Sequence, residues 1–271
     1  MELSEIRKLY VIEINLMPLA EKTKYSYRMV LEKFLSENSR CYRMSEQDLK
    51  EYFADFRTNR FSDSYYNVMC SCVKILFEKV LRQPNKMLWF KSIQSERKFK
   101  DILSYDDFVQ IMKATPNLKH KTHIIISYST GIRIGELLTI KLIDIDFANK
   151  RIFIYSEKHG KNRYVQLHPM TEKYIRAYLM KFKPKIYLFE GPNGGQYSAS
   201  SIRATLNRSA KGINKNVYPH LFRHSYLSTI IEKENVFKAM DLAGHKNLKS
   251  TMIYYHTPND QLQRMYNPLD N

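Results

Sequence analysis

The chain has 271 residues, 44% of them hydrophobic, a length that suits two modest cores better than one large core. Its 44 lysines and arginines outnumber 27 aspartates and glutamates, and the net charge of +17 favours a polyanionic partner such as nucleic acid. We exclude a secreted or membrane-spanning protein and expect a cytoplasmic one, because no run of about 18 apolar residues occurs and Glu2 and Arg7 interrupt the start.

The first ~90 residues are predicted to form a helical unit, because apolar side chains recur three and four positions apart. Ser45, with Asp48 three positions on, has the spacing of a helix-capping box. We expect Cys41, Cys70 and Cys72 to be reduced thiols, because their spacing fits neither a zinc site nor a redox motif. Three apolar stripes are interpreted as core: Tyr27, Val30, Leu31, Phe34 and Leu35; Leu49, Tyr52, Phe53 and Phe56; Tyr66, Met69, Val73, Leu76 and Val80.

A basic segment without periodicity, residues 91–100, indicates a linker. We therefore expect a helical DNA-binding domain over residues 1–92, a basic linker over 93–102, and a second domain with a C-terminal tail over 103–271. Within the second domain, Ser104 and Asp107 have the spacing of another capping box.

Residues 151–155 and 163–167 have the composition of a β-hairpin, and the remainder of the second domain has helical spacing. The expected fold class is therefore mainly α with a small antiparallel β-sheet.

Several kinds of active site are excluded by the motifs that the sequence lacks. It has no GxxxxGK[ST] loop for a nucleotide, no HExxH and no paired CxxC for zinc, and the acidic residues of its second half are scattered. We therefore expect no cofactor and no metal, and any phosphoryl chemistry must rely on side-chain cations.

Candidate cations occur in a suggestive order along the second domain. Arg133 follows a glycine turn in TGIRIGE, and we expect it in the first turn of the next helix. His220 and Arg223 lie three apart behind Pro219, a residue that suits a helix start, so both should project from one helical face. His245 follows a helix stop at Gly244, and Tyr254 comes one short helix later.

The motifs TGIRIGEL, a hairpin lysine, HLFRH, AGH and a final tyrosine, in this order, resemble those of the tyrosine recombinases, also called phage integrases. The resemblance covers residues from about 103 to 256, and the helical first domain resembles the family's core-binding domain by pattern alone. It implies a helical core-binding domain plus an α+β catalytic domain, closing around double-stranded DNA. The sequence departs from the family pattern at the packing or turn positions Phe222, Ala243 and Gln166, none of which removes a reactive group.

Two arginines and a lysine take roles from this resemblance. Arg133 and Arg223 would clamp the scissile phosphate, because guanidinium groups can bond bidentately to its oxygens and stay charged. Lys161 matches the hairpin lysine that protonates the departing 5′ oxygen. Lys158 is its competitor, and Arg163 is a further candidate for a phosphate contact.

The remaining roles fall to two histidines and a tyrosine. His220 matches the family's general base, and His245 matches the position that supports the phosphate or the nucleophile. Tyr254 matches the nucleophile that forms a 3′-phosphotyrosyl link without metal or ATP, and Tyr255 is its near rival.

We therefore expect a site-specific recombinase, Xer-like or encoded by a mobile element, that assembles as a homotetramer on DNA. Without DNA, a monomer is compatible with the sequence. Helical patterning from the first residues favours a simple two-domain form without an arm-binding domain. The apolar content of residues 255–271 suggests that this tail packs on a neighbouring subunit. A type IB topoisomerase, which relaxes DNA as a monomer, and a non-catalytic DNA-binding regulator of the same fold remain the alternatives.

Overall fold

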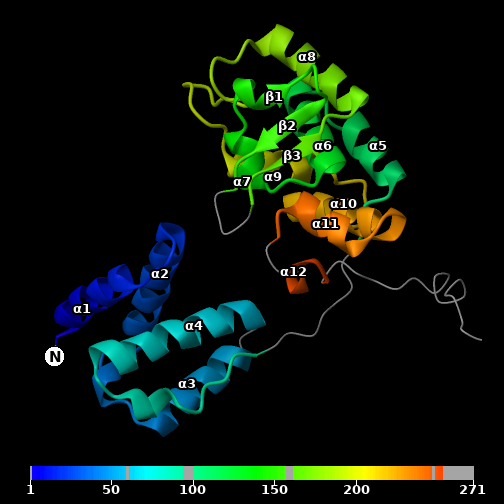
Figure 1. Ribbon diagram of the computed structural model, residues 1–271. Helices are drawn as coiled ribbons and strands as arrows, with labels where there is room; N and C mark the ends of the chain where they lie inside the picture. The colour runs from blue at the N-terminus through cyan, green and yellow to red at the C-terminus, as the bar shows by residue number, and fades with distance from the viewer. Residues whose placement is uncertain (1, 59–60, 94–100, 157–160, 246–247, 253–271) are drawn as a thin grey trace, which may run out of the picture. The chain divides into compact units, whose positions relative to one another are not determined.

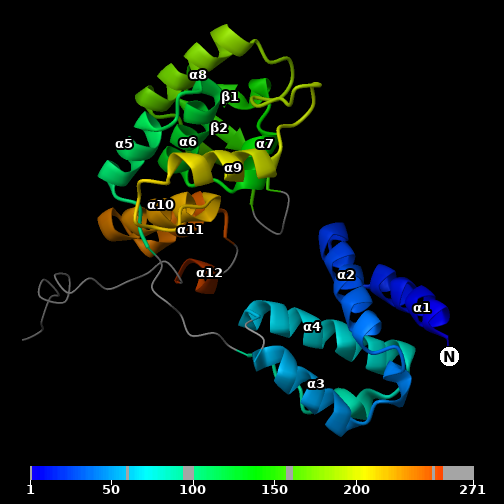
Figure 2. The ribbon, with the colours of Figure 1, turned by 180° about the vertical axis from the view of Figure 1, so that it is seen from behind.

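The computed structural model describes residues 2–58, 61–93, 101–156, 161–245 and 248–252 (Figures 1 and 2). The chain divides into two compact units, Met1–Lys98 and Phe99–Asn271, so the division falls inside the expected linker. Ile93 belongs structurally to the first unit, because its N–H donates to the Asn67 side chain (2.8 Å) and its carbonyl accepts from the same amide (2.9 Å).

The described part of the first unit is entirely helical. Every residue of the three predicted stripes is buried except Tyr27 and Tyr52, which are partly buried. Ser45 and Asp48 form the predicted capping box at the start of α3. The elements are α1 (Leu3–Leu16), α2 (Glu21–Glu37), η1 (Cys41–Arg43), α3 (Glu46–Thr58), α4 (Asp63–Ile75), a π-helical turn η2 (Leu76–Val80) and η3 (Pro84–Met87).

The second unit is mainly helical with one small sheet, which confirms the predicted fold class. Ser104 and Asp107 cap α5 reciprocally, as their spacing predicts. The elements are α5 (Tyr105–Lys113), α6 (Leu118–Thr130), α7 (Ile134–Thr139), η4 (Leu142–Asp144), β1 (Ile145–Asp146), β2 (Arg151–Ile154), β3 (Arg163–Gln166), α8 (Pro169–Phe182), α9 (Ala199–Ser209), α10 (Pro219–Lys233), α11 (Val236–Ala243) and α12 (Lys249–Met252).

The predicted hairpin is confirmed as β2 and β3, which pair antiparallel with Ile152 opposite Val165 and Ile154 opposite Arg163. The short strand β1, which lacks a sequence signal, completes the order β1-β2-β3. Because side chains alternate along a strand, Val165 and Arg163 share the buried face of β3. An arginine on a buried face requires a partner.

Helix α6 forms the centre of the second unit. It packs against α8 on one side and α10 on the other (Figures 1 and 2). Ile124, Ile125 and Ile126 are buried in the same core as Phe222 of α10 and Ile175 of α8. This core fixes the C-terminal end of α6 beside the middle of α10, where the candidate site lies.

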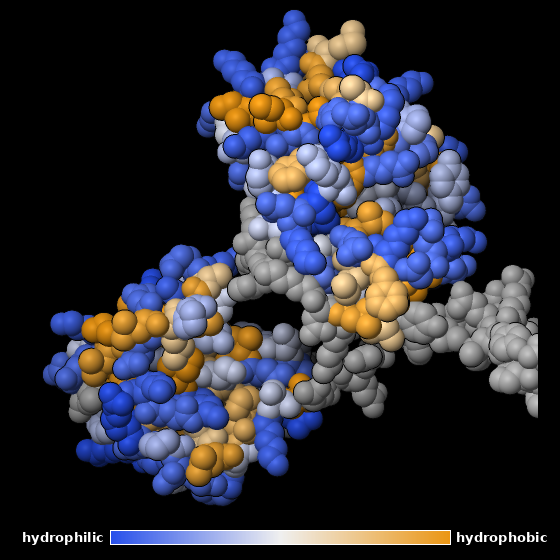
Figure 3. Space-filling model, in the orientation of Figure 1, coloured by the Kyte–Doolittle hydropathy of each residue, from blue (hydrophilic) through white to orange (hydrophobic). Residues whose placement is uncertain are grey.

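The face drawn in Figure 3 is largely hydrophilic, with apolar side chains exposed in separate groups on both units. Among the described residues, no helix is both long enough and apolar enough to cross a lipid bilayer. The cytoplasmic location stays a prediction.

The three cysteines are buried and unbridged, as the predicted reduced thiols would be. Burial raises the pKa of the Cys70 and Cys72 thiols to about 12, so little reactive thiolate forms near neutral pH.

We expect a thiol-reactive chromogenic disulfide to titrate less than about one thiol in the folded chain within minutes, and all three after denaturation. Rapid titration of two or more thiols in the folded chain would contradict this placement.

Candidate active site

Five of the six predicted site residues lie in the described part of the chain. Arg133 directly precedes α7, Arg223 lies in α10, Lys161 precedes β3, and His245 follows α11. His220 lies in the first turn of α10. Tyr254 and its rival Tyr255 lie outside the described residues, as does Lys158.

Arg223 is the largest fully buried side chain of the described residues, with 2% of its surface exposed. Its Nη1 donates to the carbonyl of Gly131 (2.9 Å) and its Nη2 to the carbonyl of Ala243 (2.8 Å). Gly131 ends α6, and Ala243 is the last residue of α11. Helix C-termini carry carbonyls without intrahelical partners and a partial negative charge, so a buried cation between two of them is stabilised.

Two glycines make this arrangement possible, since each ends its helix in the left-handed conformation, Gly131 at φ 59° and Gly244 at φ 65°. A Cβ on Gly131 would lie 2.4 Å from the Tyr226 ring, and one on Gly244 would lie 3.1 Å from both Arg163 Nη1 and the Lys161 carbonyl. Glycine is therefore required at both positions for conformation and for space.

His245 lies against Arg223, with Nε2 3.1 Å from Arg223 Nη2 and Nδ1 2.9 Å from Thr251 Oγ1. A guanidinium can only donate, so Nε2 must be the acceptor and Nδ1 must carry the proton that is donated to Thr251. Burial, and then the charges of Arg223, Arg133 and Arg163, lower the pKa of His245 to about 4. The imidazole is therefore neutral near pH 7, and it ties the end of α11 to α12.

Arg133 directly precedes α7 as its N-cap residue, with φ −72° and ψ 151°. The prediction that it lies in the first turn of the helix is therefore wrong by one residue. Glu136 accepts from the Arg133 backbone N–H (2.9 Å) and pairs with its Nη1 (2.9 Å). The Arg133 side chain stays 34% exposed, whereas that of Glu136 is only 4% exposed. A buried carboxylate thus orients a partly exposed guanidinium.

Arg163 occupies a different place from the phosphate contact considered for it. Its side chain is 7% exposed, its two terminal nitrogens pair with the two oxygens of Glu136 (2.9 and 3.1 Å), and its Nε donates to the Leu242 carbonyl (2.6 Å). Burial alone would raise the pKa of Glu136, but the hydrogen bonds and charge of Arg163, followed by those of Arg133, keep it below its usual value. Glu136 is therefore an anion shared by two arginines.

Lys161 lies two residues before β3, beside the end of α11. Its backbone N–H donates to the Gly244 carbonyl at 3.4 Å, and its side chain is exposed. The hairpin that carries this lysine is thereby attached to the residue before His245.

His220 lies three residues before Arg223, on an exposed position of α10. The helix starts at Pro219 as predicted, and the spacing places His220 on the same side of α10 as Arg223. His224 is buried, with its Nδ1 3.1 Å from Ser228 Oγ one helical turn further along α10.

Sequence reasoning did not identify Glu136, Thr251 or the true place of Arg163. Signals for two of them are present. Glu136 is three positions after Arg133, the spacing of a capping-box acid. Arg163 alternates with Val165 and Leu167, which indicates a position on the buried face of the strand.

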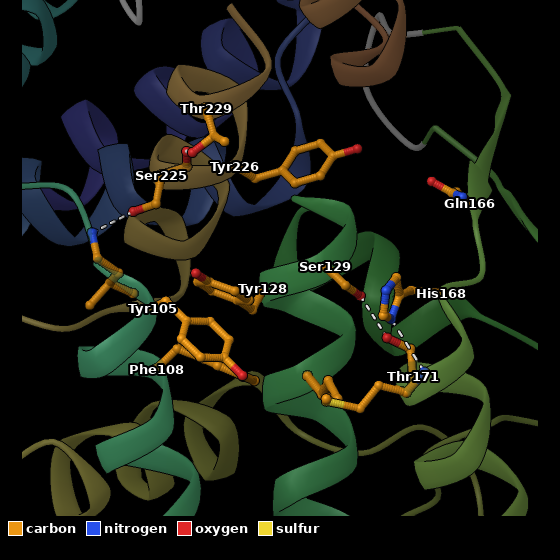
Figure 4. Close-up of a pocket in the computed structure, with 13 residues that line it drawn as sticks. Tyr105, Phe108, Tyr128, Ser129, Gln166, His168, Thr171, Ser225, Tyr226 and Thr229 are labelled. Carbon is orange, nitrogen blue, oxygen red and sulfur yellow. Dashed lines mark hydrogen bonds between the residues drawn. The ribbon is translucent and has the colours of Figure 1, made fainter. Parts of the chain in front are cut away.

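A separate pocket of about 330 Å³ lies among α5, α6, α8 and α10 (Figure 4). Tyr105, Phe108 and Tyr128 group on one side of it, and Ser129, His168 and Thr171 on the other. The pocket is lined by none of the predicted site residues. Its link to the site is Tyr226, which lines the pocket and packs on Gly131.

The site as described can bind an anion. Arg133, Arg163 and Arg223 gather with one carboxylate and one neutral imidazole. Among the described residues, no three His, Cys, Asp or Glu side chains cluster closely enough to hold a metal ion. A phosphate oxygen is the kind of ligand that exposed guanidinium and imidazole groups recognise.

Known families match both units of the chain. The model described as "Phage integrase family" matches residues 101–261, and the one described as "Phage integrase, N-terminal SAM-like domain" matches residues 9–86. A tyrosine recombinase of Thermosipho africanus is 32% identical over 184 residues, which cover 65% of this chain and 64% of that protein. The alignment thus spans less than two thirds of that relative. Tyrosine recombinase XerA of Pyrococcus horikoshii is 24% identical over 258 residues, covering 93% and 88%.

Solved structures share the fold. The Tn1549 transposon integrase in complex with circular intermediate DNA superposes with a TM-score of 0.75 at 19% identity, over 96% of this chain and 98% of that one. A lambda integrase tetramer bound to a Holliday junction gives a TM-score of 0.75 at 13% identity, over 91% and 78%.

The lowered pKa of His245 predicts a pH dependence of stability. An unfolded histidine takes up a proton below pH 6.5 and folded His245 only below about 4, so the folded state loses stability as the pH falls between these values. We expect wild type to lose about 1–2 kcal/mol more than His245→Gln over this interval, after allowance for solvent screening. The measurement is urea unfolding followed by circular dichroism.

Trp89, the single tryptophan and part of the first unit, supplies an internal control. Its fluorescence transition should be the same in both proteins at each pH. Equal pH dependence of the circular dichroism transition in the two proteins would contradict the neutral, buried state of His245.

Proposed function

The chain belongs to the phage integrase family, and from this premise we propose that it is a site-specific DNA recombinase that cuts and rejoins strands through a 3′-phosphotyrosyl intermediate. The observation that carries the proposal is the convergence of Arg133, just before α7, Arg223 of α10 and His245, just after α11, at the ends of α6 and α11. Such preorganised cations can stabilise a phosphorus centre that gains negative charge.

Arg133 and Arg223 are proposed to bind the scissile phosphate. The ion pair of Arg133 with Glu136 uses one terminal nitrogen, so its partly exposed guanidinium can still donate to a phosphate oxygen. Arg223 Nη2 donates to Ala243 and to His245. We infer that a phosphate oxygen replaces His245 Nε2 as its acceptor, after small movements that admit DNA to this buried group.

The reaction then needs a nucleophile and two proton transfers. The Tyr254 oxygen attacks phosphorus and gives up its proton to His220, while the bond from phosphorus to the 5′ oxygen breaks and Lys161 protonates that oxygen. Attack by the 5′ hydroxyl of another strand reverses these steps and releases the tyrosine. The covalent link conserves the energy of the phosphodiester bond, so no ATP is required, and the arginines and Lys161 supply the positive charge that a metal would otherwise provide.

Thr251 gives this scheme a structural support. It is fully buried in α12, bonds to His245 Nδ1, and precedes Tyr254 by three residues in the sequence. The histidine beside the phosphate is thus connected to the segment that leads to the nucleophile.

Double-stranded DNA is the proposed partner, with a homotetramer as the active assembly. The excess of basic residues supports a salt-dependent contact with DNA, and the DNA-bound tetramer of lambda integrase supports the assembly. The tail, residues 255–271, lies outside the described residues, and its packing on a neighbouring subunit stays a prediction.

The nucleophile can be tested with a nicked suicide duplex that carries a crossover site selected from randomised DNA. We expect wild type and Tyr255→Phe to form a covalent protein–DNA adduct, which denaturing electrophoresis separates, whereas Tyr254→Phe should form none. The substitution removes only the attacking oxygen, so duplex binding should be retained.

Other outcomes point elsewhere. An adduct that persists in Tyr254→Phe and disappears in Tyr255→Phe would move the nucleophile by one residue. Absence of any adduct with wild type would favour a non-catalytic regulator. Relaxation of plasmids without a specific site, and without recombinant products, would favour the type IB topoisomerase.

The general acid can be tested with a 5′-bridging phosphorothiolate at the scissile bond, because a thiolate leaves without a proton. Lys161→Ala should slow adduct formation on ordinary DNA by about 100-fold or more and should be nearly restored on this substrate. Lys158→Ala is the matched control. Rescue of Lys158→Ala and not of Lys161→Ala would transfer the role to Lys158.

A further inference from the structure

Resting on the proposed function, we propose that Arg163 is a positioning residue that keeps the charge of Arg133 available to the scissile phosphate by holding Glu136. It acts through Glu136 and does not itself contact DNA. Its side chain is only 7% exposed and donates to the Leu242 carbonyl, so it is buried beneath the surface that would face DNA.

Glu136 binds the Arg163 side chain more tightly than it binds the Arg133 side chain. Glu136 receives two parallel bonds from the Arg163 fork (2.9 and 3.1 Å), but only one side-chain bond from Arg133 (2.9 Å). A bidentate arginine pair fixes both oxygens of a carboxylate. Glu136 is thereby held in the orientation that caps α7 and steers Arg133.

The charges lead to the same conclusion. Glu136 carries one negative charge and contacts two guanidinium groups, so it can neutralise only one of them. Arg163 is buried and needs a counterion, so the negative charge of Glu136 neutralises Arg163. The positive charge of the partly exposed Arg133 is then left without a full counterion. If a neutral side chain replaced Arg163, Glu136 would pair with Arg133 alone. The carboxylate would then compete with the scissile phosphate for the Arg133 guanidinium.

Arg163 also connects three elements that build the site. It lies in β3, two residues after Lys161, it contacts α7 through Glu136, and it contacts α11 through Leu242. A Cβ on Gly244 would meet its side chain at 3.1 Å. Its loss should therefore disturb Arg133 without removing any group that touches DNA.

The test measures adduct formation on two nicked duplexes, one with an ordinary scissile phosphate and one with a methylphosphonate that lacks its negative charge. Arg163→Gln should lower the rate about 100-fold on the phosphate, but less than about 10-fold on the methylphosphonate, because a neutral centre depends less on the charge of Arg133. Arg163→Lys, which keeps the charge but loses the fork, should fall between wild type and Arg163→Gln.

Matched controls separate this role from a structural one. Arg176→Gln removes the exposed arginine of an Arg–Glu pair on α8, whose Glu172 keeps its bond to Lys150, and should change neither rate. The double variant Glu136→Gln/Arg163→Gln, which removes the competing carboxylate, should react at least about tenfold faster than Arg163→Gln on the ordinary phosphate. It also covers the case in which Arg163→Gln does not fold because the buried Glu136 carboxylate keeps only Arg133 as a counterion.

Two outcomes would overturn the inference and leave the proposed function intact. One is an equal loss of rate on both substrates, which indicates a structural defect. The other is a double variant as slow as the folded single variant. If wild type forms no adduct on either duplex, both the inference and the proposed function fail.

Discussion

The second unit depends on one buried guanidinium placed between two helix ends. Arg223 donates to the carbonyls of Gly131 and Ala243, so it joins the end of α6 to the end of α11 through α10, which carries it. Replacing Arg223 with an apolar side chain would leave these two carbonyls without their donor, at a cost of about 1–3 kcal/mol for each carbonyl. Every other element of the site is located relative to these two helix ends.

From this anchor the site is built by short connections. Gly131 is followed within two residues by Arg133, and Ala243 is followed within two by His245, so fixing the two carbonyls fixes where both side chains begin. The hairpin joins through Lys161, whose N–H meets the carbonyl of Gly244. The chain therefore assembles reactive groups that are far apart in sequence without long or irregular connections.

Much of this could be predicted because its signals are local. Pro219 starts α10, Gly244 ends α11, and the hairpin follows from strand composition with a polar turn. What sequence could not supply is pairing between elements: Arg163 and Glu136 are 27 positions apart, and nothing near Arg163 indicates which acid meets it. The two-residue strand β1 is too short for a pattern, and the one-residue shift of Arg133 arises because the helix begins at the residue after it.

The shared carboxylate and the neutral imidazole together determine what kind of anion the site favours. With Glu136 ionised and His245 uncharged, Arg133, Arg163 and Arg223 leave two net positive charges. A phosphodiester carries one negative charge, whereas the pentacovalent state formed by an attacking phenolate carries two. In the proposed reaction, the net charge of these residues would therefore match the pentacovalent state better than the bound substrate, while the Lys161 proton passes to the departing oxygen. Binding energy accelerates a chemical step when it favours the transition state in this way.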